Sequence, residues 1–141
     1  MRAEGLIDTG AILALLDRVD QWHAICSEEL KRFRLPLVTS EAVLTEVFHL
    51  ARSDRFGMES VWTFLRSGAV RLAEIQDSEL LQIHELMSRY WDRPMDFADA
   101  TLVYLAKRES LSTIFTIDHS DFETYRIDGR RKFRVLPAAR P

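Results

Sequence analysis

Four acidic side chains stand where local structure alone gives little reason for a charge. Asp8 and Asp118 each follow a short apolar run, and Glu46 and Asp99 lie on apolar faces of helical segments. Acids that are distant in sequence but lie at the ends of such elements can be gathered at one edge of a parallel sheet. Clustered carboxylates repel one another unless a cation neutralises them, so the set predicts a metal site.

Each acid also has an ordinary structural explanation. Asp8 and Asp118 could each cap the N-terminus of a helix, and Glu46 borders a buried stripe from which its carboxylate could reach solvent. Asp99 is harder to explain in this way, because apolar residues occupy the next turn of its helix without a Lys or Arg to pair with it. A desolvated, unpaired carboxylate is costly, so we expect a cationic partner from elsewhere. Asp96 precedes it by three residues, and a first-turn acid favoured by the helix dipole explains it as well as a site role does.

The ligand types favour a hard metal ion. The four His residues lie in separate segments without zinc-site spacing, and the single cysteine, Cys26, is predicted to be a core residue. Oxygen ligands alone favour Mg²⁺ or Mn²⁺, which polarise phosphoryl oxygens and help to activate water. The matching reaction is the hydrolysis of a phosphodiester bond. Glycine-rich nucleotide loops and Ser or Cys nucleophile motifs are absent from the sequence.

The elements that would position these acids alternate along the chain. Apolar periodicity and turn residues predict strands separated by one or two helices, which implies an α/β fold with a parallel sheet covered on both faces. In such a fold, sites form at the carboxyl ends of the strands. The predicted strands are 4–8, 35–38, 69–72, 112–117 and 133–136, and the predicted helices are 12–16, 21–34, 41–52, 58–66, one opening at 77–78 and one starting at 96–98.

Length and composition predict one domain over residues 1–141. The chain is 47% hydrophobic, which supports one packed core, and its 141 residues are too few for two ordinary domains. Its apolar runs fall short of the roughly 20 residues of a membrane span, and the first residues lack the apolar segment of a secretory signal. We expect a soluble, cytoplasmic protein that does not contact a membrane.

Positive charge is concentrated near the C-terminus. The net charge is −3, which argues against a protein that holds nucleic acid by overall charge, yet six of the residues from 126 to 141 are Arg or Lys and one is acidic. Two interpretations remain open, a solvated and partly disordered tail or a surface that contacts phosphates or a partner.

Four segments together resemble the motifs of PIN-domain ribonucleases, especially the VapC toxins of toxin-antitoxin pairs. They occur in the family's order and are residues 6–10 (LIDTG), 39–47 (TSEAVLTEV), 95–100 (MDFADA) and 116–122 (TIDHSDF). The resemblance implies a three-layer α/β/α sandwich with a central parallel sheet. It also implies endoribonuclease activity that depends on Mg²⁺ or Mn²⁺, a homodimer, and inhibition by a cognate antitoxin protein that reaches the active-site groove.

The resemblance also implies roles for individual residues. Asp8, Glu46, Asp99 and Asp118 match the family's acidic quartet, which would hold metal and activate water, with Asp8 and Asp99 as the principal ligands. Around them, the resemblance suggests auxiliary acids and hydroxyl groups that orient carboxylates or bound water. These are Asp96 and Asp121 for the acids, and Thr9, Ser40 and Thr116 for the hydroxyl groups.

Other functions remain open on sequence alone. The chain could be a stand-alone PIN-domain nuclease in RNA processing instead of a toxin, or a non-catalytic module that binds RNA or protein. The intact quartet argues against the binding module, since a scaffold gains nothing from crowded acids. A metal phosphatase would need a closed pocket for small phosphoesters.

Overall fold

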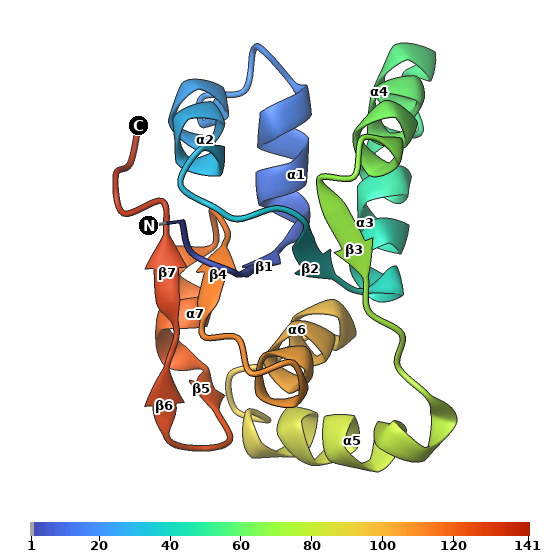
Figure 1. The fold of residues 1–141 in the computed structure, drawn as a ribbon. Helices are drawn as coiled ribbons and strands as arrows, with labels where there is room; N and C mark the ends of the chain where they lie inside the picture. The colour runs from blue at the N-terminus through green and yellow to red at the C-terminus, as the bar shows by residue number, and fades with distance from the viewer. Residues whose placement is uncertain (1) are drawn as a thin grey trace.

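Five short parallel strands form the central sheet in the computed structural model, which describes residues 2–141 (Figure 1). The strand order is β3-β2-β1-β4-β7, and every neighbouring pair is parallel. The prediction of a parallel sheet is therefore confirmed, with the first strand at its centre. The strands are β1 (Leu6–Ile7), β2 (Leu37–Thr39), β3 (Val70–Leu72), β4 (Thr113–Phe115) and β7 (Arg134–Leu136).

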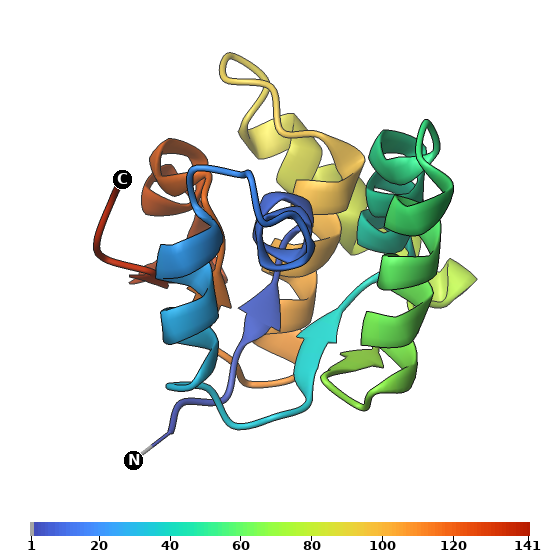
Figure 2. The same ribbon diagram turned by 90° about the horizontal axis from the view of Figure 1, so that it is seen from above.

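Helices cover both faces of this sheet. Figures 1 and 2 show the first four helices on one face and α5 with α6 on the other, which is the predicted three-layer α/β/α arrangement. The helices are α1 (Thr9–Leu16), α2 (His23–Leu30), α3 (Glu41–Ala51), α4 (Arg55–Arg66), α5 (Leu80–Arg89), α6 (Phe97–Arg108) and α7 (His119–Thr124), with a 3₁₀ turn, η1 (Asp77–Glu79), before α5. None of the helices within residues 2–141 combines the length and the apolar character needed to cross a membrane.

The core lies where the central strands meet the helices. Both residues of β1 are completely buried, and so are Ile114 and Phe115 of β4. The ring of Phe115 stacks on that of Phe33 with centroids 5.0 Å apart. Because apolar side chains cover both faces of these strands, they appear in the sequence as continuous apolar runs without polar alternation.

The C-terminal region is ordered, in contrast to one of the two interpretations of its basic residues. A partly disordered tail is wrong, because residues after 125 form an antiparallel hairpin of β5 (Arg126–Ile127) and β6 (Arg131–Lys132), and β7 then joins the sheet. Helix α7 was also not predicted. These elements are two to six residues long, too short for apolar periodicity to show.

Candidate active site

Helix caps bring the predicted residues to the carboxyl ends of the strands. Asp8 follows β1 and is the N-cap of α1, Ser40 follows β2 and caps α3, and Asp118 follows β4 and caps α7. Asp96 caps α6, where its carboxylate accepts a hydrogen bond from the backbone amide of Asp99 at 2.8 Å. Four helix N-termini therefore meet at this edge, and their partial positive charge favours carboxylates there. Strand β1 runs away from the viewer in Figure 1, as Figure 2 shows, so the site lies on the far side of the first view.

Gly10 allows α1 to start close to the loop that carries Asp118. A Cβ atom at this position would lie 2.7 Å from Cγ1 and 2.9 Å from Cδ1 of Ile117. Only glycine fits this approach without a shift of its neighbours. The spacing of Asp8 from Asp118 thus depends on a missing side chain.

Two hydroxyl groups connect the acids. The Thr116 hydroxyl donates to Oδ2 of Asp8 at 3.0 Å and accepts from the backbone amide of Asp118 at 2.9 Å. The Thr9 hydroxyl donates to Oε1 of Glu46 at 2.8 Å, while its backbone amide donates to Oδ1 of Asp8 at 2.7 Å. Asp8 is therefore fixed through both oxygens, and Glu46 is tied to the same segment.

Three carboxylates form the tightest group. Asp99, Asp118 and Asp121 each offer an oxygen within 4.8 Å of the others, and among the described residues this is the one group of this kind. Asp99 is buried in α6 and accepts a hydrogen bond from the Tyr125 hydroxyl at 3.1 Å. Asp121 accepts one from Nη2 of Arg93 at 3.0 Å. One donor therefore orients each of these two acids from outside the group.

Burial and mutual repulsion raise the pKa values of the clustered acids. Desolvation, with the charges of Asp8 and Asp96, raises the pKa of Asp99 to about 8. Desolvation also raises the pKa of Asp8 to about 6, with smaller contributions from Glu46 and Asp118. The pKa of Asp118 rises to about 6, through desolvation and its contact with the Asp121 carboxyl. At low pH, protonation removes the charge repulsion between these carboxylates. Near neutral pH, a bound cation could neutralise them instead.

The donor set fits a hard divalent cation. Its atoms are carboxylate oxygens, supported by threonine hydroxyls, and this is the ligand chemistry of Mg²⁺ and Mn²⁺. The raised pKa values agree with this, since they show that the acids lack a positive partner of sufficient strength within the fold. The side chain of Arg93 is partly exposed, and among these acids it forms an ion pair only with Asp121.

Among the predicted supporting residues, three contact the acids and Ser40 does not. Thr9, Thr116 and Asp121 contact the acids directly, whereas Ser40 bonds to the amide of Val43 and the hydroxyl of Thr101, both away from the carboxylates. The sequence gives no sign that Tyr125, Arg93 or Thr101 bonds to these residues. Tyr125 follows α7 and Arg93 lies before α6, so their contacts arise from packing between elements and leave no local pattern.

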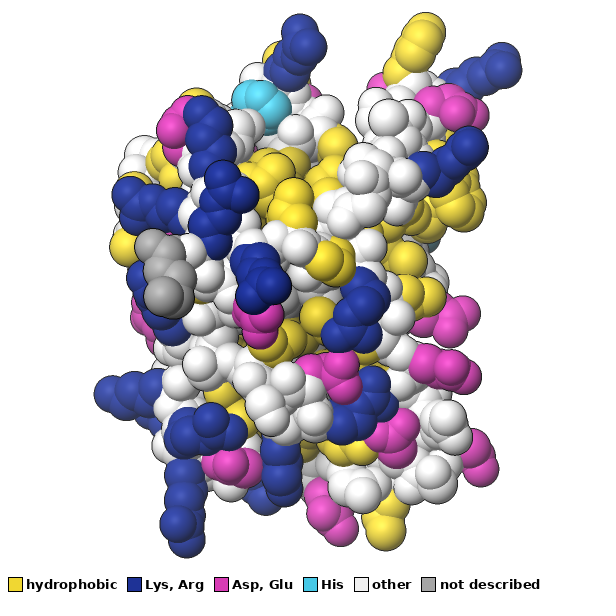
Figure 3. Space-filling view, in the orientation of Figure 1, with side chains coloured by type: hydrophobic (Ala, Val, Ile, Leu, Met, Phe, Trp, Pro, Cys, Tyr) yellow, Lys and Arg dark blue, Asp and Glu magenta, His cyan; other side chains and the backbone are white. Residues whose placement is uncertain are grey.

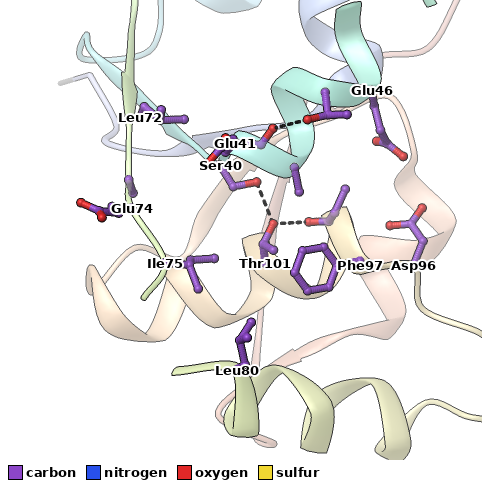
Figure 4. Close-up of a pocket in the computed structure, with 14 residues that line it drawn as sticks. Ser40, Glu41, Glu46, Leu72, Glu74, Ile75, Leu80, Asp96, Phe97 and Thr101 are labelled. Atoms are coloured by element: carbon purple, nitrogen blue, oxygen red, sulfur yellow. Dashed lines mark hydrogen bonds between the residues drawn. The ribbon is translucent and has the colours of Figure 1, made fainter. Parts of the chain in front are cut away.

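A cavity opens beside the acids. It measures about 790 Å³ and lies between α3, the chain after β3, and the start of α6 (Figure 4). Glu46 and Asp96 line it on the side of the acids, and Leu80 and Ile75 line the opposite side. The site is therefore continuous with a larger hollow surface.

Comparisons with known proteins show which family the chain resembles. A model of the PIN domain family matches residues 5–128. Ribonuclease VapC26 of Mycobacterium tuberculosis is 34% identical over 135 residues, which cover 94% of this chain and 99% of the relative.

Solved structures share the fold. The crystal structure of VapC20 of Mycobacterium tuberculosis, a Sarcin-Ricin loop cleaving toxin, superposes with a TM-score of 0.72 at 20% identity, covering 82% of this chain and 91% of that one. The structure of PAE2754 from Pyrobaculum aerophilum gives a TM-score of 0.50 at 20% identity, covering 84% and 83% of the two chains. The family model, which spans most of the chain, and the identity to VapC26 together show that this protein belongs to the PIN-domain family, within its VapC group.

Proposed function

We propose that this protein is an endoribonuclease that depends on Mg²⁺ or Mn²⁺, and that it acts as the toxin of a VapBC-type toxin-antitoxin pair. The observation that carries the proposal is the convergence of Asp99, Asp118 and Asp121 within 4.8 Å beside Asp8, in a chain of the VapC group. The names of VapC26, a ribonuclease, and VapC20, a Sarcin-Ricin loop cleaving toxin, support RNA as the substrate class.

We assign the acids to distinct roles. Asp8 and Asp99, the two buried members, would hold the principal cation, and Glu46 and Asp118 would complete the site. Asp121 lies close enough to share the ion with Asp99 and Asp118. When bound, the cation would neutralise the acids and polarise the phosphoryl oxygen of the substrate.

The chain itself would position the reactants and move the proton. Asp118 is exposed, so its carboxylate can reach the attacking water, which it would orient and from which it could accept the proton. Thr116 would hold Asp8 and the backbone of Asp118 in a fixed relation during this step. Thr9 would do the same for Glu46.

We infer three partners and a location from group membership. RNA is the substrate, a cognate antitoxin protein is the inhibitor, and a second copy of the chain forms a homodimer. The cytoplasm is the compartment where these partners meet. Apolar side chains that remain exposed on α3 and α4, namely Leu50, Phe56 and Trp62, are available for protein contacts.

The first experiment compares RNA cleavage with and without divalent metal. Purified protein without antitoxin would be incubated with total RNA and transfer RNA in Mg²⁺, in Mn²⁺ and in excess EDTA. We expect discrete products that EDTA abolishes, and a loss of about 100-fold or more in Asp8→Asn and in Asp99→Asn, since each removes a ligand. Asp17→Asn, at the opposite end of α1 from Asp8, is the matched control. Undiminished cleavage by either site variant, or full activity in EDTA, contradicts the proposal.

A further inference from the structure

We propose that the cavity beside the acids binds a base of the RNA substrate, from a nucleotide next to the scissile phosphate. This inference rests on the proposed ribonuclease function and adds a specificity site to it. The cavity volume of about 790 Å³ falls within the range of about 300–1,000 Å³ that is usual for small-molecule sites.

The cavity and the acidic site share two walls. Glu46 contacts Thr9 in the acidic site and also lines the cavity, and Asp96, the cap beside Asp99, lines it as well. Figure 4 shows both side chains on the same side of the cavity. When a phosphate of an RNA chain lies at the acids, the adjacent nucleotide therefore lies close to the opening of the cavity.

The cavity presents an aromatic ring where a base would enter. Phe97 is the first residue of α6, and 46% of its surface is exposed although it lies next to buried residues. Figure 4 shows its ring between Asp96 and the apolar side chains Ile75 and Leu80. Flat bases of single-stranded RNA stack on such rings, and a neighbouring apolar wall excludes water from the stack.

The charge of the lining favours a base over a phosphate. Four acids line the cavity, Glu41, Glu46, Glu74 and Asp96, and the described lining contains no Lys or Arg. A phosphate would be repelled there, whereas the amino groups of adenine, cytosine and guanine can donate to carboxylates. The carboxylate of Glu41 forms no ion pair within residues 2–141, so it can accept such a bond, whereas Figure 4 shows the Glu74 side chain pointing away from the cavity. We therefore expect bases with an amino group to be preferred over uracil.

A second copy of the chain is a poorer occupant. In a twofold dimer the same surface is present on both subunits, so an interface centred on this cavity would bring its acids close to the identical acids of the partner. Such like-charge contacts are unfavourable without cations between them. The part of the lining that the structure describes contains no cationic side chain.

The test is the base preference at the cleavage site. A library of short single-stranded RNA with randomised positions would be cut by the wild-type protein in Mn²⁺, and sequencing of the products would give the preference at each flanking position. We expect one position where amino-bearing bases exceed uracil. Phe97→Ala should raise the RNA concentration for half-maximal cleavage about 5- to 150-fold, the range for loss of one base stack. Phe97→Tyr should keep the wild-type value.

Matched variants separate the causes. Glu41→Gln should shift the preference toward uracil, and Trp91→Ala, an exposed aromatic outside the cavity lining, should leave both the preference and RNA binding unchanged. Cleavage without any flanking preference, or RNA binding that Phe97→Ala leaves unchanged, overturns the inference and leaves the ribonuclease in place. Sedimentation that shows a dimer lost in Phe97→Ala, with unchanged RNA binding, assigns the cavity to a second copy instead. Absence of cleavage by the wild type under all conditions overturns both.

Discussion

At the scale of single residues, Asp99 has neighbours with opposing effects. Burial and nearby acids raise its pKa to about 8, whereas the hydroxyl of Tyr125 donates to it and favours the ionised form. Tyr125 is fully enclosed and packs edge-on against Tyr90 and Phe122, so its hydroxyl has a fixed direction. A metal ion must displace the proton of Asp99, and Tyr125 lowers the free energy of that exchange.

Removal of the Tyr125 hydroxyl should weaken metal binding. In Tyr125→Phe we expect the Mn²⁺ concentration for half-maximal cleavage to rise about 10-fold, as is typical when a supporting hydrogen bond to a ligand is removed. The rate at saturating metal should stay close to wild type. Calorimetric titration of Mn²⁺ should show the same shift. Tyr104→Phe is the control, because that hydroxyl bonds to Glu79 outside the site. An unchanged Mn²⁺ requirement would show that Tyr125 serves packing alone.

The raised pKa values predict how the stability of the metal-free protein depends on pH. The folded state keeps a proton on Asp99 up to about pH 8, whereas the unfolded chain releases it near the ordinary pKa of 3.8. The folded state thus binds more protons between these values, so the free energy of unfolding falls as pH rises from about 4 to 8. Thermal unfolding in EDTA should show this decline, and Asp99→Asn should flatten it. A melting temperature that rises over this range would contradict the raised pKa.

At the scale of elements, the start of α1 determines how closely two acids approach. Gly10 is the second residue of this helix, and Ile117 packs where its side chain would be. Ile117 immediately precedes Asp118, so a displacement of Ile117 would also move Asp118. We therefore expect a change at this contact to affect both the stability and the activity of the protein.

An added methyl group at this contact should disturb both properties. Gly10→Ala should lower the free energy of unfolding by about 1–3 kcal/mol, the usual cost of overpacking, and should reduce cleavage by displacing Asp118. In an Ile117→Ala background the clashing atoms are absent, so the same change should cost little. Chemical denaturation of the four proteins forms a double-mutant cycle that measures the coupling. Equal costs in both backgrounds would show that Ile117 moves freely.

The elements that the sequence predicts well are those whose patterns are local. Glu46 and Asp99 stand out because they interrupt apolar faces, and α3 and α6 start close to their predicted positions. The contacts of Tyr125 and Arg93 could not be predicted, because they depend on how α7 and the chain before α6 pack. The β5–β6 hairpin was missed because two-residue strands rich in arginine carry no alternation.

At the scale of the whole molecule, an acidic site must receive a polyanion. The net charge is −3, yet Arg130, Lys132 and Arg134 are exposed in the hairpin and β7 and form no ion pair within the described residues. Figure 3 shows Lys and Arg side chains projecting over this part of the molecule. We expect them to contact RNA phosphates away from the acids.

Neutralisation of these three cations should weaken RNA binding through electrostatics alone. In Arg130→Gln, Lys132→Gln, Arg134→Gln we expect weaker binding of single-stranded RNA. A plot of log affinity against log salt should have a slope that falls by about 0.7 for each phosphate that the variant no longer neutralises. The Asp8→Asn background prevents cleavage during the measurement. An unchanged slope would show that RNA reaches the site by another surface.

The order of strands in the sheet determines when the site can form during synthesis on the ribosome. The site needs Asp8 from the first strand and Asp121 from the last helix, and β4, which precedes that helix, is bordered by β7 at residues 134–136. A growing chain therefore has no assembled site until these late segments have left the exit tunnel. Cleavage activity, which needs all of these segments, should therefore appear only when synthesis of the chain is nearly complete.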